Sequence, residues 1–157
     1  MADNLIVLSR QLSSYLQVAQ SLSDNLESPS RIVTLNEFET PGFDSTAYRN
    51  IIAVGSKAGD SLFHKAPADQ KLFISFLPRQ TYKKILKKYA DHPRIKERNV
   101  TAVYLDQPYP RQLALARLLA PKAKTIATAL GPNSQNDLGI LKEAAKQQSL
   151  TLKYETL

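Results

Sequence analysis

Six residues of this sequence lie in the polar turns that follow apolar runs with the composition of buried β-strands, and their types suit ligand binding. Each run is short, contains β-branched residues and ends in a polar turn. Ligands of open α/β sheets bind in the crevice outside the carboxyl ends of the strands. We therefore expect the residues of these turns to bind a ligand. They are Ser9, Gln11, Gly55, Ser56, Asp106 and Gln107.

These turns offer hydrogen-bonding groups and one negative charge. Asp106 favours a ligand that carries a donor or a cation, whereas the helix start at Gly55 and Ser56 favours an anion or a polar acceptor. Together they predict a small polar or amphoteric ligand. Purely structural interpretations stay open at this point. Gly55 can simply make a tight turn with Ser56 as the helix cap, and Asp106 can cap the next helix or pair with Arg111.

The sequence lacks the patterns that accompany catalysis. No second carboxylate or histidine is paired with Asp106 in sequence, and neither His64 nor His92 lies near a carboxylate cluster. The glycine-rich dinucleotide fingerprint, the phosphate-loop lysine motif and the nucleophile-elbow serine are all missing. Hydrogen-bonding groups without an acid–base pair suit binding better than catalysis. We expect a protein that is not an enzyme, with no catalytic or metal-ligating residue and no cofactor.

Strand-like and helix-like segments alternate along the chain. Helical spacing of apolar residues predicts a helix between each pair of neighbouring strands except the second and third, which a polar loop joins. This alternation predicts a three-layer α/β sandwich with a mostly parallel sheet, flavodoxin-like or Rossmann-like, and right-handed crossovers. Ser13 or Ser14 is expected to cap the first helix, and Asn133 or Ser134 the last. The strands are expected at 5–8, 31–38, 51–54, 71–77, 103–105, 125–130 and 150–157.

The size, the cysteine content and the net charge of the chain limit the kinds of partner and chemistry to expect. The chain has 157 residues, 43% of them hydrophobic, and no cysteine, so one domain with a real core is expected and thiolate chemistry is excluded. The net charge of +7 raises the expectation of an anionic partner. Four lysines between residues 83 and 88 could form a nucleic-acid or membrane-surface helix. Because Tyr82 and Tyr89 fall on the apolar stripe instead of among the lysines, a solvated outer face is the better interpretation, and nucleic acid is not the expected partner.

Three segments resemble the substrate-binding proteins of ABC transporters, in the uncharacterised type I periplasmic-binding group. They are AVGSKA at 53–58, FISFLPRQTYKKIL at 73–86 and NVTAVYLDQPYPRQLALARLLAPKAKTIATALGP at 99–132. The resemblance extends over most of the chain, and the DQP turn with RQLAL is its most specific part. It implies a solute-binding component of an ABC-type transport system, with a small-molecule solute and a transporter permease as partners.

The resemblance also implies two α/β lobes that enclose the ligand by hinge closure. Residues 1–120 then correspond to lobe one and residues 121–157 to the opening strand-helix-strand of lobe two, as in a truncated or naturally short form. A lone strand-helix-strand leaves sheet edges exposed. We expect these residues to pack on lobe one as extra strands or to pair with another copy, which would give a homodimer.

The N-terminal sequence bears on the cellular location, and two other classes of function remain open beside the transport interpretation. The start Met-Ala-Asp-Asn, followed by LIVL, has neither a basic segment nor a long apolar segment of a secretory leader. The resemblance implies a periplasmic or extracytoplasmic location with the signal peptide already removed. The alternative is a cytoplasmic flavodoxin-like regulatory or enzymatic domain, and a signal peptide in the parent gene would distinguish the two. A nucleic-acid-binding module built on the lysine helix is the third interpretation, supported if retention on a polyanion depends on salt.

Overall fold

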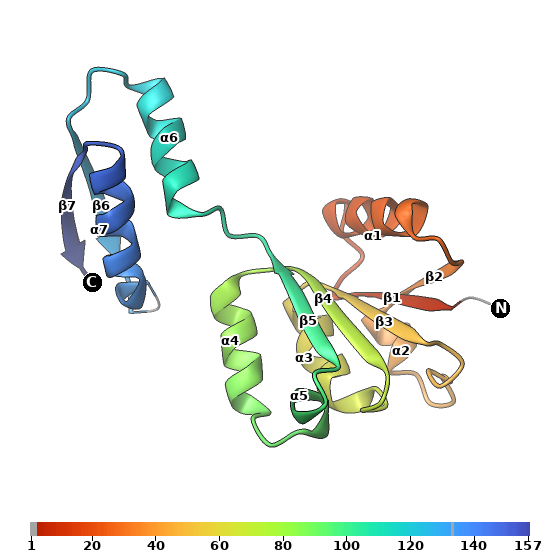
Figure 1. The fold of residues 1–157 in the computed structure, drawn as a ribbon. Helices are drawn as coiled ribbons and strands as arrows, with labels where there is room; N and C mark the ends of the chain where they lie inside the picture. Colours follow the sequence, from red (N-terminus) through yellow and green to blue (C-terminus); the bar gives the residue numbers. More distant parts are fainter. Residues whose placement is uncertain (1–2, 133) are drawn as a thin grey trace. The chain divides into compact units, whose positions relative to one another are not determined.

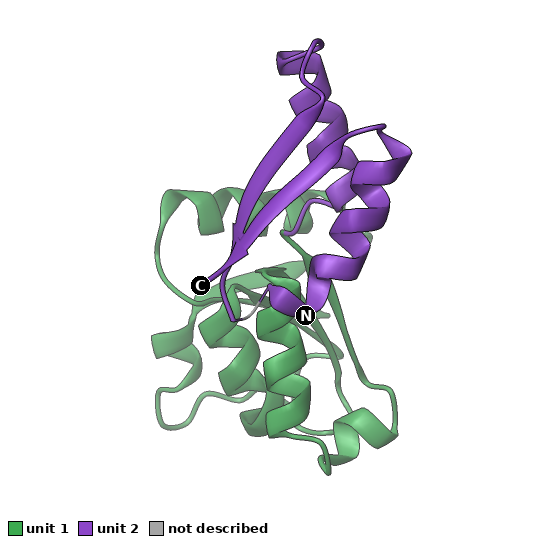
Figure 2. Ribbon diagram, turned by 90° about the vertical axis from the view of Figure 1, so that its left-hand side faces the viewer, with its two compact units in different colours: residues 1–105 green, residues 106–157 purple. Residues whose placement is uncertain are grey.

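The computed structural model describes residues 3–132 and 134–157. The chain divides into two compact units, residues 1–105 and 106–157, which are described separately (Figure 2). The first unit contains β1 (Asn4–Leu8), α1 (Ser13–Asn25), β2 (Ser30–Thr34), α2 (Leu35–Phe38), β3 (Asn50–Val54), α3 (Ser56–Lys65), β4 (Lys71–Leu77), α4 (Arg79–Lys88), α5 (Pro93–Lys96) and β5 (Val100–Tyr104). The second contains α6 (Tyr109–Leu119), β6 (Thr125–Leu130), the 3₁₀ helix η1 (Gln135–Asp137), α7 (Leu138–Gln147) and β7 (Thr151–Thr156).

The five strands of the first unit form one parallel sheet in the order β2-β1-β3-β4-β5. The register pairs Leu8 with Thr34 on one side and with Val54 on the other, so these three strands end at the same level. The predicted α/β class with a mostly parallel sheet is confirmed. Parallel pairing also gathers the carboxyl ends of the strands along one edge, where ligands of such sheets bind.

Alternate residues of the central strands are buried on opposite faces of this sheet. Leu5 and Val7 of β1 belong to the cluster covered by α2, α3 and α4, whereas Ile6 and Leu8 belong to the cluster covered by α1 (Figure 1). All four side chains are at most 1% exposed. Strands buried on both faces read as continuous apolar runs, which explains why LIVL shows no polar alternation.

The second strand is shorter than its sequence pattern predicts. We expected a strand over 31–38, but β2 ends at Thr34 and residues 35–38 form α2. The Thr34 Oγ1 accepts from the Glu37 N–H at 3.2 Å, and the Glu37 carboxylate accepts from the Thr34 N–H at 2.7 Å. This reciprocal capping box starts a helix and overrides the strand-like alternation of the segment.

The predicted serine caps are wrong. The residue before α1 is Leu12, with no side-chain cap, so neither Ser13 nor Ser14 caps that helix. The N-cap of α7 is Asp137, because η1 intervenes, and the Ser134 hydroxyl donates to the Gly131 carbonyl instead. Asn133 lies outside the described residues.

In the second unit, α6 and α7 pack on a two-stranded parallel sheet of β6 and β7. Its core joins Leu113 of α6 to Leu130, Leu141 and Leu150. The division after residue 105 places α6 with these strands, one helix earlier than the boundary expected at residue 120. No helix among the described residues is long and apolar enough to cross a membrane.

Candidate functional site

The candidate site is the edge of the first unit where β1 and β3 end and α3 begins. Ser9 directly follows β1, and its N–H donates to the Val54 carbonyl at 2.9 Å. Its Oγ accepts from the Ala58 N–H at 2.8 Å. The Ser9 side chain therefore supplies an acceptor to the first turn of α3 from a different strand. This bond holds the end of β1 next to the end of β3, as the sequence analysis expects.

Gly55 makes the turn from β3 into α3 with φ 94° and ψ 166°, a region that residues with a side chain rarely adopt. Its N–H donates to the Ser75 carbonyl at 2.9 Å. A Cβ at this position would lie 2.6 Å from the Ser9 Oγ and 3.1 Å from the Tyr15 Cζ. Both the backbone conformation and the close approach therefore require glycine here.

Ser56 is the first residue of α3, so the interpretation of Ser56 as the helix cap is wrong, and the N-cap is Gly55. Ser56 is half-buried and the next residue, Lys57, is exposed. The first turn of α3 contains no acidic residue. The N–H groups of a first helical turn and the helix dipole favour an anion, and Lys57 adds a positive charge beside them.

Two aromatic residues that sequence analysis did not single out lie near this turn. The Tyr15 and Phe76 rings meet edge to face, with their centroids 5.3 Å apart. Phe76 has φ 58°, a left-handed conformation, and lies where the pairing of β4 with β5 shifts between Ile74 and Leu77. The local sequence FISFL does not predict this bulge, because phenylalanine is not a residue that favours positive φ.

The other predicted residues are placed differently. Gln11 is exposed in the loop between β1 and α1. Asp106 and Gln107 are exposed and begin the second unit. The Gln107 carbonyl accepts from the Gln112 Nε2 at 2.7 Å, and its Oε1 accepts from the Arg111 Nη1 at 3.4 Å. The N-cap of α6 is Pro108, so Asp106 does not cap that helix. The structure thus brings Ser9, Gly55 and Ser56 together, and a binding role for all six residues stays a prediction.

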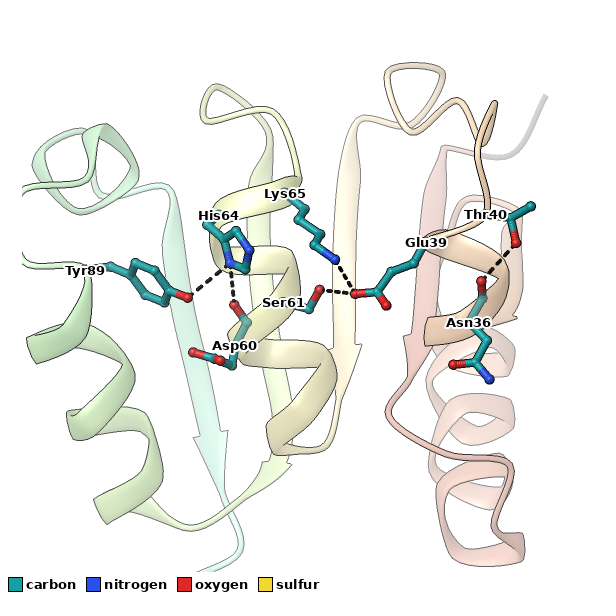
Figure 3. Close-up of polar contacts among 8 residues, drawn as sticks. All are labelled: Asn36, Glu39, Thr40, Asp60, Ser61, His64, Lys65 and Tyr89. Atoms are coloured by element: carbon teal, nitrogen blue, oxygen red, sulfur yellow. Dashed lines mark hydrogen bonds and ion pairs between the residues drawn. The ribbon is translucent and has the colours of Figure 1, made fainter.

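A second polar cluster lies on the face covered by α2, α3 and α4 (Figure 3). The Glu39 carboxylate accepts from the Lys65 Nζ and from the Ser61 Oγ, each at 2.6 Å, and these bonds lower the pKa of Glu39. The His64 Nδ1 lies 3.1 Å from both the Asp60 carbonyl oxygen and the Tyr89 hydroxyl. These contacts tie neighbouring helices together. The described residues contain no group of three or more potential metal ligands.

An apolar groove of about 420 Å³ lies at the opposite, amino-terminal edge of the sheet. Leu22 of α1 and Leu26, the C-cap residue of that helix, line it together with Phe73 of β4 and Arg98. The groove exists because α1 is the helix that packs on this face within the described residues, and it contacts β1 and β3. None of the six predicted residues lines it.

The chain was compared with known proteins. No family model and no curated protein matches it. Solved structures do match over 98–100% of its length. The ligand-free, open form of CD0873, a substrate-binding protein with adhesive properties from Clostridium difficile, has a TM-score of 0.67 at 16% identity.

Two further structures have TM-scores of 0.54. One is a conserved domain protein from Vibrio cholerae at 14% identity, and the other is an ABC domain in complex with L-Trp from Streptococcus pneumoniae at 15% identity. The chain spans 58%, 58% and 56% of these three proteins' lengths. At such identities the likeness shows the fold. The chain shares the α/β fold of these three proteins.

Proposed function

We propose that this chain is the solute-binding component, or part of it, of an ABC-type transport system, and that it binds a small polar molecule without catalysis. The observation that carries the proposal is the turn at Gly55, where a backbone conformation that favours glycine starts α3 beside the end of β1. The fold shared with substrate-binding proteins supports it. A periplasmic or extracytoplasmic location and a permease partner belong to the same proposal.

The chemistry of the rim suggests what such a solute carries. The helix start with Lys57 suits a carboxylate or another small anion. The Tyr15 and Phe76 rings, half-buried beside it, suit an apolar or aromatic portion. A free amino acid with an apolar side chain has both parts, and the structural neighbour in complex with L-Trp supports this class.

A thermal-shift screen of amino acids, sugars and small anions tests the proposal. A ligand at about 100 times its Kd stabilises the folded protein by about 2.7 kcal/mol, which raises the melting temperature by a measurable amount. We expect a carboxylate-bearing solute to give the largest shift. No response to any solute in the screen would contradict the proposed binding role.

A charge placed at the helix start makes the screen specific. Ser56→Asp adds a carboxylate to the first turn of α3, which suits the helix dipole but repels an anionic solute. We expect this variant to fold and to lose the response. Ala47→Asp is the matched control, because Ala47 is exposed in the loop before β3, at the other end of the strand. An unchanged response in Ser56→Asp would place binding elsewhere.

A further inference from the structure

The carboxyl end of β4 breaks the alternation of side chains that the rest of the strand follows. Leu72 and Ile74 pack in the cluster covered by α2, α3 and α4, whereas Phe73 packs in the cluster covered by α1. In a regular strand Phe76 would lie on the same side as Ile74, two residues earlier. The structure shows the reverse, with Phe76 on the α1 side and Leu77 on the opposite side.

A β-bulge causes this reversal. The pairs Ile74–Ala102 and Leu77–Tyr104 flank it, and between these two pairs β4 has one more residue than β5. Phe76 lies in the bulge with φ 58°. A bulky residue rarely adopts a positive φ, whereas glycine does so readily. The sequence therefore has phenylalanine at a position that glycine would occupy at a lower conformational cost.

The bulge lies at the candidate site. Ser75 is the last residue of β4 that pairs with β3, and its carbonyl accepts from the Gly55 N–H at 2.9 Å. The Phe76 and Tyr15 rings have their centroids 5.3 Å apart and their planes at 85°. Tyr15 in turn lies against the Gly55 turn, because a Cβ on Gly55 would be 3.1 Å from the Tyr15 Cζ. The reversal thus places a second aromatic ring beside Tyr15 at the edge where α3 begins.

We propose that Phe76 determines the specificity of the solute site, because its ring and the Tyr15 ring together contact the apolar portion of the solute. This inference rests on the proposed binding function. Two rings that meet nearly at right angles form a corner, and an apolar group in that corner contacts both. Bulges next to functional sites re-aim side chains, and strained residues persist there because the surrounding structure holds them.

A purely structural explanation of the bulge makes a different prediction. The reversal also buries Leu77 completely, and the Phe76 ring would then serve only to fill the cluster covered by α1. The two explanations differ in what the ring contributes, which is either affinity for the solute or stability of the fold. Phe73 is the matched control, because it packs on the same side of β4 where the pairing with β5 is regular.

Isothermal titration calorimetry with glycine, L-alanine, L-leucine and L-phenylalanine measures the specificity, since these solutes share their polar groups and differ in the apolar portion. We expect the affinity of the parent protein to rise with the size of that portion. Phe76→Gly should lower the affinity for the tightest-binding amino acid by about tenfold or more, and the affinity for L-alanine by less than about threefold. Phe73→Ala should leave both affinities unchanged.

Urea unfolding of variants at the same two positions tests the strain. Phe76→Gly should have a higher urea midpoint than Phe76→Ala, because glycine adopts a positive φ more readily than alanine. The order should be reversed between Phe73→Gly and Phe73→Ala, because glycine weakens the interior of a strand. A lower midpoint for Phe76→Gly than for Phe76→Ala would remove the strain on which the inference depends.

The binding measurements separate this inference from the proposed function. Unchanged affinity in Phe76→Gly, an equal loss for L-alanine and the tightest-binding amino acid, or a loss in Phe73→Ala as large as in Phe76→Gly would overturn the inference and leave the binding function standing. If none of the four amino acids binds the parent protein, the inference fails together with the amino-acid class of solute.

Discussion

Gly55→Ala is the substitution whose effect the structure specifies most closely. Gly55 has φ 94° and ψ 166°, and an alanine held there costs about 1–3 kcal/mol in backbone strain. The added Cβ would also lie 2.6 Å from the Ser9 Oγ and 3.1 Å from the Tyr15 Cζ, and overpacking of this kind costs about 1–3 kcal/mol. We expect the free energy of unfolding of the first unit to fall by about 3 kcal/mol.

Two further variants separate the causes. Gly42→Ala meets a similar φ of 88° but has nothing within 4 Å of the new Cβ, so it should cost about 1 kcal/mol from backbone strain alone. Ser9→Ala removes the acceptor of the Ala58 N–H and also the atom that the new Cβ would strike. The double variant S9A/G55A should therefore be more stable than the sum of the single effects predicts.

Urea unfolding followed by far-ultraviolet circular dichroism measures these differences, with the first unit fitted as its own transition if the two units unfold separately. A Gly55→Ala variant within about 0.5 kcal/mol of the parent protein would refute both the strain and the steric argument, since that is the range of ordinary surface substitutions.

Three other outcomes can be checked by the same unfolding measurements. Arg94→Met should lower the free energy of unfolding by about 3 kcal/mol, because the fully buried guanidinium donates to the carbonyls of Ala66, Pro67 and Gln70, and these carbonyls would lose their donor. An unchanged urea midpoint would show that the three carbonyls find other donors. Thr34→Ala should cost about 1 kcal/mol through loss of the α2 capping box, whereas a neutral effect would assign no stability to that cap. The pKa of Glu39 is lowered in the folded state, so the contribution of its carboxylate to the free energy of unfolding is present above the ordinary glutamate pKa and is lost as pH falls through the lowered pKa. Glu39→Gln should therefore weaken the dependence of the free energy of unfolding on pH in the acid range. The same pH dependence in variant and parent protein would contradict a stabilising role for the Glu39 carboxylate.

The fold was accessible from sequence because buried parallel strands leave a strong pattern. Runs such as LIVL and IIAV are apolar on both faces, and seven strand-like segments, most of them separated by helix-like segments, leave few topologies. The pattern failed where a local motif competed with it. At Thr34 the spacing of threonine and glutamate starts a helix, although the alternation continues to Phe38.

The site was accessible only in outline. Rules for open sheets lead from the strand ends to Ser9, Gly55 and Ser56, and the structure brings these three together. The left-handed conformation of Phe76 has no local sequence cause, because it follows from the shifted pairing of β4 with β5. Arg94 is buried although charged residues are usually exposed. The carbonyls that accept its hydrogen bonds belong to a loop about 25 residues earlier in the chain, and no local sequence pattern predicts this contact.

The most direct test of the account is where a solute binds. In a ¹⁵N-labelled sample titrated with the best solute from the thermal-shift screen, we predict that the amide signals of Gly55, Ser56 and Lys57 shift most. The amide signals of Gly55 and Lys57 should not respond to the solute in Ser56→Asp, whereas Ala47→Asp should behave like the parent protein. Shifts concentrated instead around Leu22, Leu26 and Arg98 would place the ligand in the apolar groove and contradict the account.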